Sequence, residues 1–487
     1  MGRYHVHNAR FYRVYRFRQI KEKKRRKECV KTYLENLGFD VNERALEVIR
    51  ECGDWYSNND IEGFTTRTNL NEVTEEVLRL NFVKRCCADD ANLCEIVSIT
   101  PETSEALQEV VDKLMENNRF EIRYREQLEK TSAQGTVGAY IYLDNSDILM
   151  DASGRTSIQN GEIKINYVDA DCTVPLTVEN RLVTECAFTS TNTTRGKERT
   201  TLVIFLKDNG KYKANTVYFD DKGHVEESII LELGEVKPFA ILTNAEVNNL
   251  DFMDGYGLPK VYNAITFFKA LDLAFTLLYG DLDKGEKVVF INELLACIRQ
   301  DNGRPTLTPQ QKKLFVLMGE KLPDEKTLVQ EYNPEIRIEQ ITKIIELILS
   351  MISLSFGYGT KKYSFENGQI KTATEYIGEK QDEMQELNKQ RRQAEDYIKD
   401  IIRAALWFSN KFKGTNYDID EGFIVEFDDS FIEDKQSKLE SMRTDALSFP
   451  ELPFIKLKYI MLKYNLPEEE AKKYMAGALT EDEELED

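Results

Sequence analysis

The sequence is poor in the residues on which most enzymatic chemistry depends. Its 487 residues include only three histidines, His5, His7 and His224, so a histidine-based active site is not expected. The eight cysteines show neither metal-ligand spacing nor a disulfide framework, which in so long a chain indicates buried thiols in a reducing compartment. The phosphate-binding GxxxxGKS/T loop, the HExxH zinc motif and the GxSxG nucleophile motif are absent. We therefore predict no enzymatic activity, no catalytic residue and no cofactor.

Long apolar runs and net positive charge are missing too. The most apolar stretch, Ile344–Phe356, is too short for a membrane span and is interrupted by Glu346 and three serines. The first residues are basic and contain no apolar core, so no secretory signal is expected. With a formal net charge of -20, the molecule as a whole should repel nucleic acid rather than wrap it. We predict no contact with a membrane.

Two pairs of acids are the candidates for a metal site. Asp169 and Asp171 would face the same side of a strand, and Asp428 and Asp429 precede a predicted helix. Either pair could bind a divalent metal in a nuclease. Turn acids and helix caps are commoner roles for such residues, so we predict no metal ligand. A metal-dependent nucleic-acid enzyme remains the alternative function.

The spacing of apolar residues predicts an α+β fold, and the length allows two to four domains. Residues 28–134 have helical patterns, with predicted helices up to about Leu80 and over Leu70–Cys87, Thr100–Asn117 and Phe120–Gln134. After Gly135 the pattern changes to an antiparallel β domain of about 100 residues. Its predicted strands are Val137–Leu143, Ile163–Val168, Cys172–Leu176, Arg181–Thr189, Thr200–Lys207, Lys211–Phe219 and Glu226–Leu233.

Two long helical segments enclose a small mixed insert. Leu258–Asp283 is apolar on two faces, which predicts burial on both, inside a core or between subunits. The insert Gly285–Glu331 contains the predicted strand Val288–Asn292, and a second apolar helix, Glu335–Phe356, follows it. We expect a hairpin of two helices with a small head at its tip.

The chain is organised around a loop and the long helix that follows it. The loop Gly357–Gln369 contains three glycines, three aromatic residues and two adjacent lysines, which predicts a small movable finger. Ile370–Phe412 contains no proline and could form one helix of about 60 Å. That length suits a large assembly, although an amphipathic helix in a bundle would also fit. Its apolar seam comprises Ile377, Met384, Leu387, Ala394, Ile398, Ile401 and Ala405.

The two ends of the chain have opposite charge. Residues 1–27 are basic with interleaved aromatics and could bind nucleic acid, although a solvated arm or a helix docked on an acidic partner would look the same. Tyr417–Phe427 is a predicted strand, and Pro453–Tyr464 and Glu468–Ala478 are predicted short helices. The tail Glu481–Asp487 is almost wholly acidic and is expected to be disordered.

Three stretches carry a resemblance to a known family. They are DGYGLPKVYNAITFFKALDLAFTLLYGDLDKGEKVVFIN, SFGYGTKKYSFENGQIKTATEYIGEKQDEMQ and VEFDDSFIEDKQSKLESMRTDAL. In this order they resemble the portal proteins of tailed bacteriophages, in the subgroup common among phages of Gram-positive hosts. The resemblance spans about Arg50–Ala478, and another phage head or neck structural protein is a further alternative.

The resemblance implies a portal-type architecture and function. The parts would be a basic arm (1–27), a wing (28–247), a first stem helix (248–284), a clip (285–331), a second stem helix (332–356), a tunnel loop (357–369), a long wing helix (370–412), a small helical crown (413–479) and an acidic tail (480–487). A dodecameric ring would surround a channel for double-stranded DNA at one capsid vertex, for genome packaging, retention and ejection and for head-tail connection. Its partners would be the terminase large subunit, the head-tail adaptor and the major capsid protein, with a scaffold as an optional partner. The ring would assemble in the host cytoplasm and remain in the virion.

The same resemblance suggests which residues would act. The channel side chains of the tunnel loop would be Tyr358, Lys361, Lys362, Tyr363 and Phe365, with hinges at Gly357, Gly359 and Gly368. Contacts between stems of neighbouring subunits would involve Phe268, Leu271, Phe275, Leu278, Ile345, Ile348 and Ile352. The clip would contact its partners through Arg299, Arg304, Lys312 and Lys313. A solvated turn is the alternative role for Lys361 and Lys362.

Overall fold

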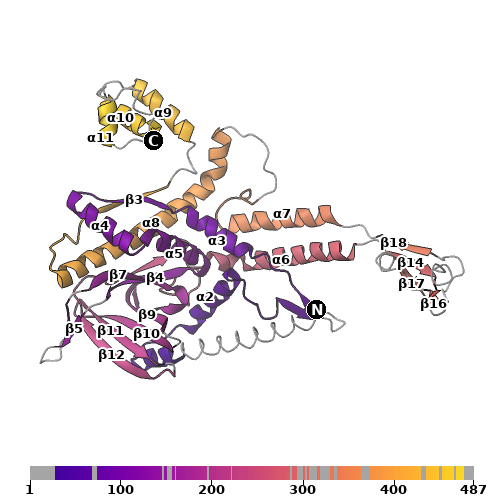
Figure 1. Cartoon of the computed structure of the whole chain (residues 1–487), viewed down its shortest axis with the longest axis horizontal. Helices are drawn as coiled ribbons and strands as arrows, with labels where there is room; N and C mark the ends of the chain where they lie inside the picture. The colour runs from indigo at the N-terminus through magenta and orange to yellow at the C-terminus, as the bar shows by residue number, and fades with distance from the viewer. Residues whose placement is uncertain are drawn as a thin grey trace.

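The molecule is elongated, with a broad mixed body, two long helices that lead away to a small β head, and a group of short helices beside the body (Figure 1). The mixture of helices and strands confirms the predicted α+β class. The basic arm and the acidic tail lie outside the described residues. This computed structural model describes residues 28–68, 74–144, 147–150, 156–159, 161–194, 197–220, 222–285, 288–292, 300–301, 304–305, 315–318, 329–333, 337–363, 373–428, 435–448, 452–464 and 468–475.

Helices form the first part of the body. They are residues 28–36, α2 (Glu43–Tyr56), α3 (Phe82–Asn92), α4 (Glu105–Asn117) and α5 (Phe120–Gln134). The helix predicted over Leu70–Cys87 is wrong over residues 74–81, where β2 (Thr74–Glu76) pairs antiparallel with β1 (Thr66–Thr68) and no helix forms before Phe82.

The reason for this difference lies in a distant helix. The amides of Leu78 and Leu80 donate to Thr276 Oγ1 and Asp272 Oδ1, each at 2.9 Å. These hydrogen bonds hold the chain extended along the first stem helix until α3 begins at Phe82. A local apolar pattern does not reveal such long-range partners.

Two antiparallel sheets fill the centre of the body, in the orders β12-β11-β10-β9-β8 and β13-β4-β7. Phe188 and Phe205 of the larger sheet lie 5.6 Å from Phe239 of the smaller one, ring centroid to centroid, so aromatic packing joins the two. The seven predicted strands are confirmed, whereas β13 and the hairpin β5–β6 were not predicted. The bounds are β4 Thr136–Asp144, β5 Asp147–Met150, β6 Thr156–Gln159, β7 Glu162–Asp169, β8 Thr173–Glu179, β9 Leu182–Thr194, β10 Lys197–Asp208, β11 Lys211–Phe219, β12 Val225–Glu232 and β13 Phe239–Thr243.

The two stem helices are α6 (Lys260–Lys284) and α7 (Ile338–Ser355), which pack along each other and carry the β head at their far end (Figure 1). This confirms the predicted hairpin of helices with a head. In the head, β14 (Val288–Asn292) runs parallel to β17 (Phe315–Met318) and antiparallel to β18 (Val329–Tyr332), and β15 (Gln300–Asp301) pairs with β16 (Arg304–Pro305).

The segment Lys260–Asp283 is long and apolar enough to cross a membrane, but the core helix of a globular protein can have the same length and composition. Of its most apolar 18-residue stretch, 39% is buried within the subunit. The near end of α6 packs against α2 and α5 of the body. The near end of α6 is therefore held in the body, whereas its far half has exposed apolar side chains.

The long helix α8 (Ala373–Lys413) has 41 residues and is about 60 Å long. It crosses the body beside the sheet β13-β4-β7. Of the predicted seam, Leu387, Ala394, Ile398, Ile401 and Ala405 are buried, and Met384 is partly buried.

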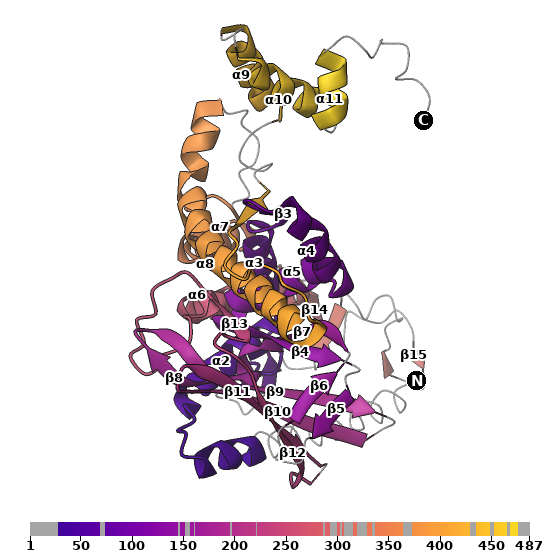
Figure 2. The same ribbon diagram turned by 90° about the vertical axis from the view of Figure 1, so that its left-hand side faces the viewer.

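After α8 the chain returns to the mixed body. Strand β19 (Phe423–Phe427), which falls within the range predicted for the crown, pairs antiparallel with β3 (Ile96–Pro101). The Glu421 carboxylate accepts hydrogen bonds from Thr103 and from the Ser104 amide, which lower the pKa of Glu421. Three short helices follow, α9 (Lys435–Ser448), α10 (Pro453–Tyr464) and α11 (Glu468–Met475), and they stand beyond the upper end of α8 (Figure 2).

Candidate functional site

The loop that follows α7 begins with a tightly fixed turn. The Gly357 amide donates to the Leu354 carbonyl and the Tyr358 amide to the Ser353 carbonyl, both at 3.0 Å, which is the Schellman pattern of a helix C-terminus. Gly357 has φ +79°, and a Cβ there would lie 3.0 Å from Glu386 Cγ. Gly359 is also left-handed, at φ +71°. Both predicted hinge glycines therefore shape a turn in this conformation, and Gly368 lies outside the described residues.

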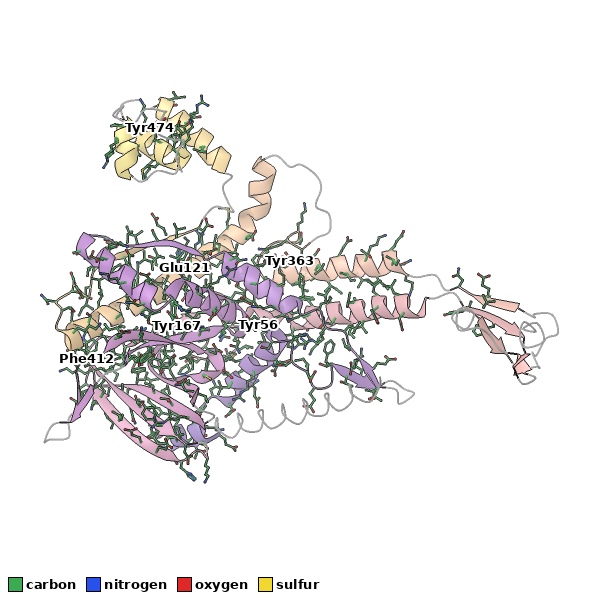
Figure 3. All side chains as sticks on the ribbon, in the orientation of Figure 1. Tyr56, Glu121, Tyr167, Tyr363, Phe412 and Tyr474 are labelled. Atoms are coloured by element: carbon green, nitrogen blue, oxygen red, sulfur yellow. The ribbon has the colours of Figure 1, made fainter. Side chains whose placement is uncertain are left out.

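Two of the three aromatic residues predicted to face a channel, Tyr358 and Tyr363, contact the body of the subunit instead. Tyr358 is only 3% exposed, and its hydroxyl donates to Asp90 Oδ1 of α3 at 2.8 Å. The hydroxyl of Tyr363 donates to Asp89 Oδ2 at 3.2 Å, and its ring meets Phe82 edge-on at 5.0 Å between centroids. Figure 3 shows Tyr363 at the body end of the two long helices. The expectation that these two side chains project from the loop is corrected here, because carboxylates of α3 give their hydroxyls partners inside the subunit.

The two adjacent lysines of the loop have different environments. Lys362 forms an ion pair with the nearly buried Glu383 of α8, and its ammonium lies 3.8 Å from the centre of the Tyr358 ring. Lys361 is exposed. The solvated-turn alternative therefore fails for Lys362, while Phe365 lies outside the described residues.

A buried ionic cluster lies beneath this turn, made of Lys260, Asp90 and Glu386. The ammonium of Lys260 is fully buried, 2.7 Å from Asp90 Oδ1 and 3.3 Å from Glu386 Oε1. Lys389 reaches Glu386 Oε2 from the surface side at 3.2 Å. Burial by itself lowers the pKa of Lys260, but the carboxylates of Asp90 and Glu386 outweigh it, and the net effect raises that pKa. Sequence reasoning missed this cluster, whose one local signal is a lysine at the start of an apolar helix.

A close approach of backbones positions that lysine. The space that a Cβ of Gly135 would need is occupied by the Gly257 carbonyl oxygen, and the Gly257 amide donates to Thr136 Oγ1 at 2.8 Å. The end of α5 and the segment before α6 therefore lie against each other. This contact fixes where Lys260, the first residue of α6, enters the core.

The stem helices differ most from the sequence-based expectation. Phe268, Leu271 and Ile352 are at most 2% exposed, so these predicted contacts between subunits belong to the core of one subunit. The other predicted stem residues, Phe275, Leu278, Ile345 and Ile348, are partly buried. The periodicity identified apolar faces, but it did not tell which of them is covered within the subunit.

The uncovered apolar residues of α7 form an outer seam, at 3-4-3 spacing, of Ile344, Leu347, Met351 and Leu354. They are 49%, 59%, 37% and 54% exposed, respectively. On the far half of α6, Leu277, Tyr279 and Leu282 are exposed as well. A helix seam at this spacing is the kind that packs against another helix.

The clip and the acid pairs add little chemistry in the described part of the chain. Arg304 lies in β16, and Arg299, Lys312 and Lys313 are outside the described residues. Asp169 Oδ1 is 2.7 Å from the ammonium of Lys130, an ion pair that competes with a metal for this carboxylate. Asp428 accepts from Arg391 through its backbone carbonyl, and Asp429 is not described. Within the described residues, no group of three or more His, Cys, Asp or Glu side chains could hold a metal ion.

Comparison with known proteins gives one finding that covers most of these features. A family model described as phage portal protein, SPP1 Gp6-like, matches residues 89–449, about three-quarters of the chain. The match includes both stem helices, the head, the loop and α8. No curated protein matches the chain.

Proposed function

The chain belongs to the SPP1 Gp6-like family of phage portal proteins, and on that premise we propose that copies of it form a closed ring around a channel for double-stranded DNA. Members of this family are structural, non-enzymatic proteins of the virion capsid that assemble as oligomers. The proposed ring is dodecameric, lies at one vertex of the capsid, and serves genome packaging, retention and ejection as well as head-tail connection.

The observation that carries the proposal is the outer seam of α7. Covering a half-exposed apolar side chain with a second surface lowers the free energy by about 1 kcal/mol, because it removes apolar surface from water. The far half of α6 offers exposed apolar residues as well, Leu277, Tyr279 and Leu282. We propose that the outer seam of one subunit packs against α6 of the next, a heterologous contact that closes by rotation.

Charge supports the passage of DNA. Each subunit carries a formal net charge of -20, so a ring of them repels phosphates along most of its surface and lets a duplex slide. We propose that the tunnel loop meets the DNA through Lys361 and Phe365, while Tyr358, Lys362 and Tyr363 support the base of the loop. The clip, through Arg299, Arg304, Lys312 and Lys313, is proposed to contact the terminase large subunit and later the head-tail adaptor.

Electron microscopy of the purified chain tests the proposal. We expect annular particles with a central hole. Leu347→Glu should abolish them, because it places a charge in the proposed contact, whereas Leu182→Glu, at a residue 71% exposed in β9, should leave them intact. A folded, concentrated protein that remains monomeric would overturn the ring.

A further inference from the structure

We propose that two adjacent carboxylates of α3, Asp89 and Asp90, act as a loop latch. They hold residues 357–363 on the body through Tyr363 and Tyr358, and so set where the tunnel loop leaves the subunit. This inference rests on the proposed function, because only a channel gives the exit point of that loop a role. The contacts that define the latch lie within one subunit.

The inner half of the latch is built on the buried ionic cluster. Asp90 Oδ1 accepts from both the Tyr358 hydroxyl, at 2.8 Å, and the Lys260 ammonium, at 2.7 Å. Asp90 is 9% exposed and Tyr358 3%. One carboxylate oxygen thus joins the turn after α7 to the first residue of α6, inside a space that excludes most water.

The outer half of the latch uses the next residue of α3. Asp89 Oδ2 accepts from the Tyr363 hydroxyl at 3.2 Å and from Arg85 Nε at 2.9 Å. Between the two tyrosines, Lys362 binds Glu383 of α8 and covers the ring of Tyr358. The segment 357–363 is therefore fastened to α3 at both ends and to α8 in the middle.

Losing Tyr358 and losing Lys260 have different costs in this network. If Tyr358 leaves, Asp90 keeps the ammonium of Lys260, so the cost is one hydrogen bond to a charged group. If Lys260 is lost, two buried carboxylates lose their shared counter-ion, and the attachment of α6 itself is weakened. The loop can thus be released while Lys260 keeps α6 attached to the body.

Glu386 completes the latch from α8. Its side chain lies against Gly357, where any Cβ would meet it, and its carboxylate shares Lys260 with Asp90. The position of the turn at Gly357 therefore depends on the position of α8 relative to α6. We infer that Asp89, Asp90 and Glu386 are positioning residues for the loop, acting through the two tyrosines and Lys260.

Hydrogen exchange of the full chain, followed by mass spectrometry, tests the latch. In Tyr358→Phe the amides of residues 357–363 should exchange about tenfold faster or more, as expected for losing one hydrogen bond to a charged group, while α6 and α7 keep their protection. Tyr142→Phe, at an exposed tyrosine of β4, is the matched control and should change nothing. Unchanged exchange at 357–363, or an equal rise throughout the subunit, would overturn the latch.

A double variant separates a positioning role from general packing. Because Tyr358 acts through Asp90, and alanine leaves no acceptor for its hydroxyl, the exchange of 357–363 in Tyr358→Phe with Asp90→Ala should be no faster than in Asp90→Ala alone. Fully additive effects would overturn the assignment. Ring formation is scored on the same samples by electron microscopy. Absence of rings with the expected exchange pattern contradicts the proposed function alone, and rings with unchanged exchange contradict the latch alone.

Discussion

The buried ionic cluster around Lys260, the first residue of α6, and the outer seam of α7 have opposite character. The cluster places charges where water is excluded, and each charge has a partner of opposite sign within the subunit. The seam places large apolar side chains in water, 37% to 59% exposed. A subunit can bury charges that it neutralises itself, whereas an exposed apolar face is stabilised when another surface covers it. The first region is therefore complete in one chain, and the second calls for a neighbour.

The largest effect is expected from removing the central charge of the cluster. Lys260→Met leaves Asp90 and Glu386 buried without their shared ammonium, and should lower the free energy of unfolding by about 3–5 kcal/mol. Denaturant titration measures this. Lys343→Met, at an exposed lysine of α7, should change it by less than about 0.5 kcal/mol. Equal unfolding midpoints for the two variants would mean that the cluster adds no stability.

Next in size is a charge placed in the outer seam. Leu347→Glu should weaken each contact between subunits by about 2–3 kcal/mol, because it removes apolar burial and leaves a carboxylate to be desolvated. The stability of the isolated subunit should change little, since Leu347 is 59% exposed. Sedimentation velocity follows the assembly state and thermal unfolding follows the subunit. If Leu347→Glu lowers the stability of the subunit but leaves the rings intact, the outer seam stabilises the subunit and not the contact between subunits.

A smaller effect is expected at the turn between the two regions. Gly357→Ala must adopt a positive φ and also meets Glu386, so it should cost about 2 kcal/mol. Gly414→Ala has a similar φ of +69° but no neighbour within 4 Å, and should cost about 1 kcal/mol. The difference between the two, measured by chemical denaturation, reports the contact with α8. No difference would show that Glu386 moves aside freely.

The smallest expected effect separates the two lysines of the loop. Lys362→Ala breaks the ion pair with Glu383 and should destabilise the subunit by about 1 kcal/mol, while Lys361→Ala should stay within about 0.5 kcal/mol. Thermal unfolding distinguishes them. In the proposed ring, Lys361→Ala should affect DNA retention instead. A result in which Lys361→Ala is the more destabilising variant would contradict the assignment of Lys362 to the base of the loop.

Much of the fold could be predicted from the sequence, because its signals are local. Alternation of apolar residues predicted the strands of the larger sheet, and helical spacing predicted α6, α7 and α8 to within three residues at either end. The prediction was wrong where distant groups decide the backbone. The chain before α3 is extended because Asp272 and Thr276 bind its amides, and β19 joins β3 although more than 300 positions separate them.

The candidate site was predicted only in outline. The loop after α7 and its lysines were found from glycine, aromatic and basic residues in one short stretch. The inward placement of Tyr358, Lys362 and Tyr363 could not be found that way, because their partners lie on α3 and α8. Five of the eight cysteines are buried thiols, as predicted, and burial raises the pKa of Cys86 and of Cys94 to about 12.

The sequence by itself determined which segments are helices and strands, that α6 and α7 enclose a small head, and that α6 is apolar on two faces. These properties follow from the spacing of side chains along one element. Only the tertiary structure decided which of those faces the subunit covers and which charges it buries, because burial depends on the surfaces that other elements bring to the same place.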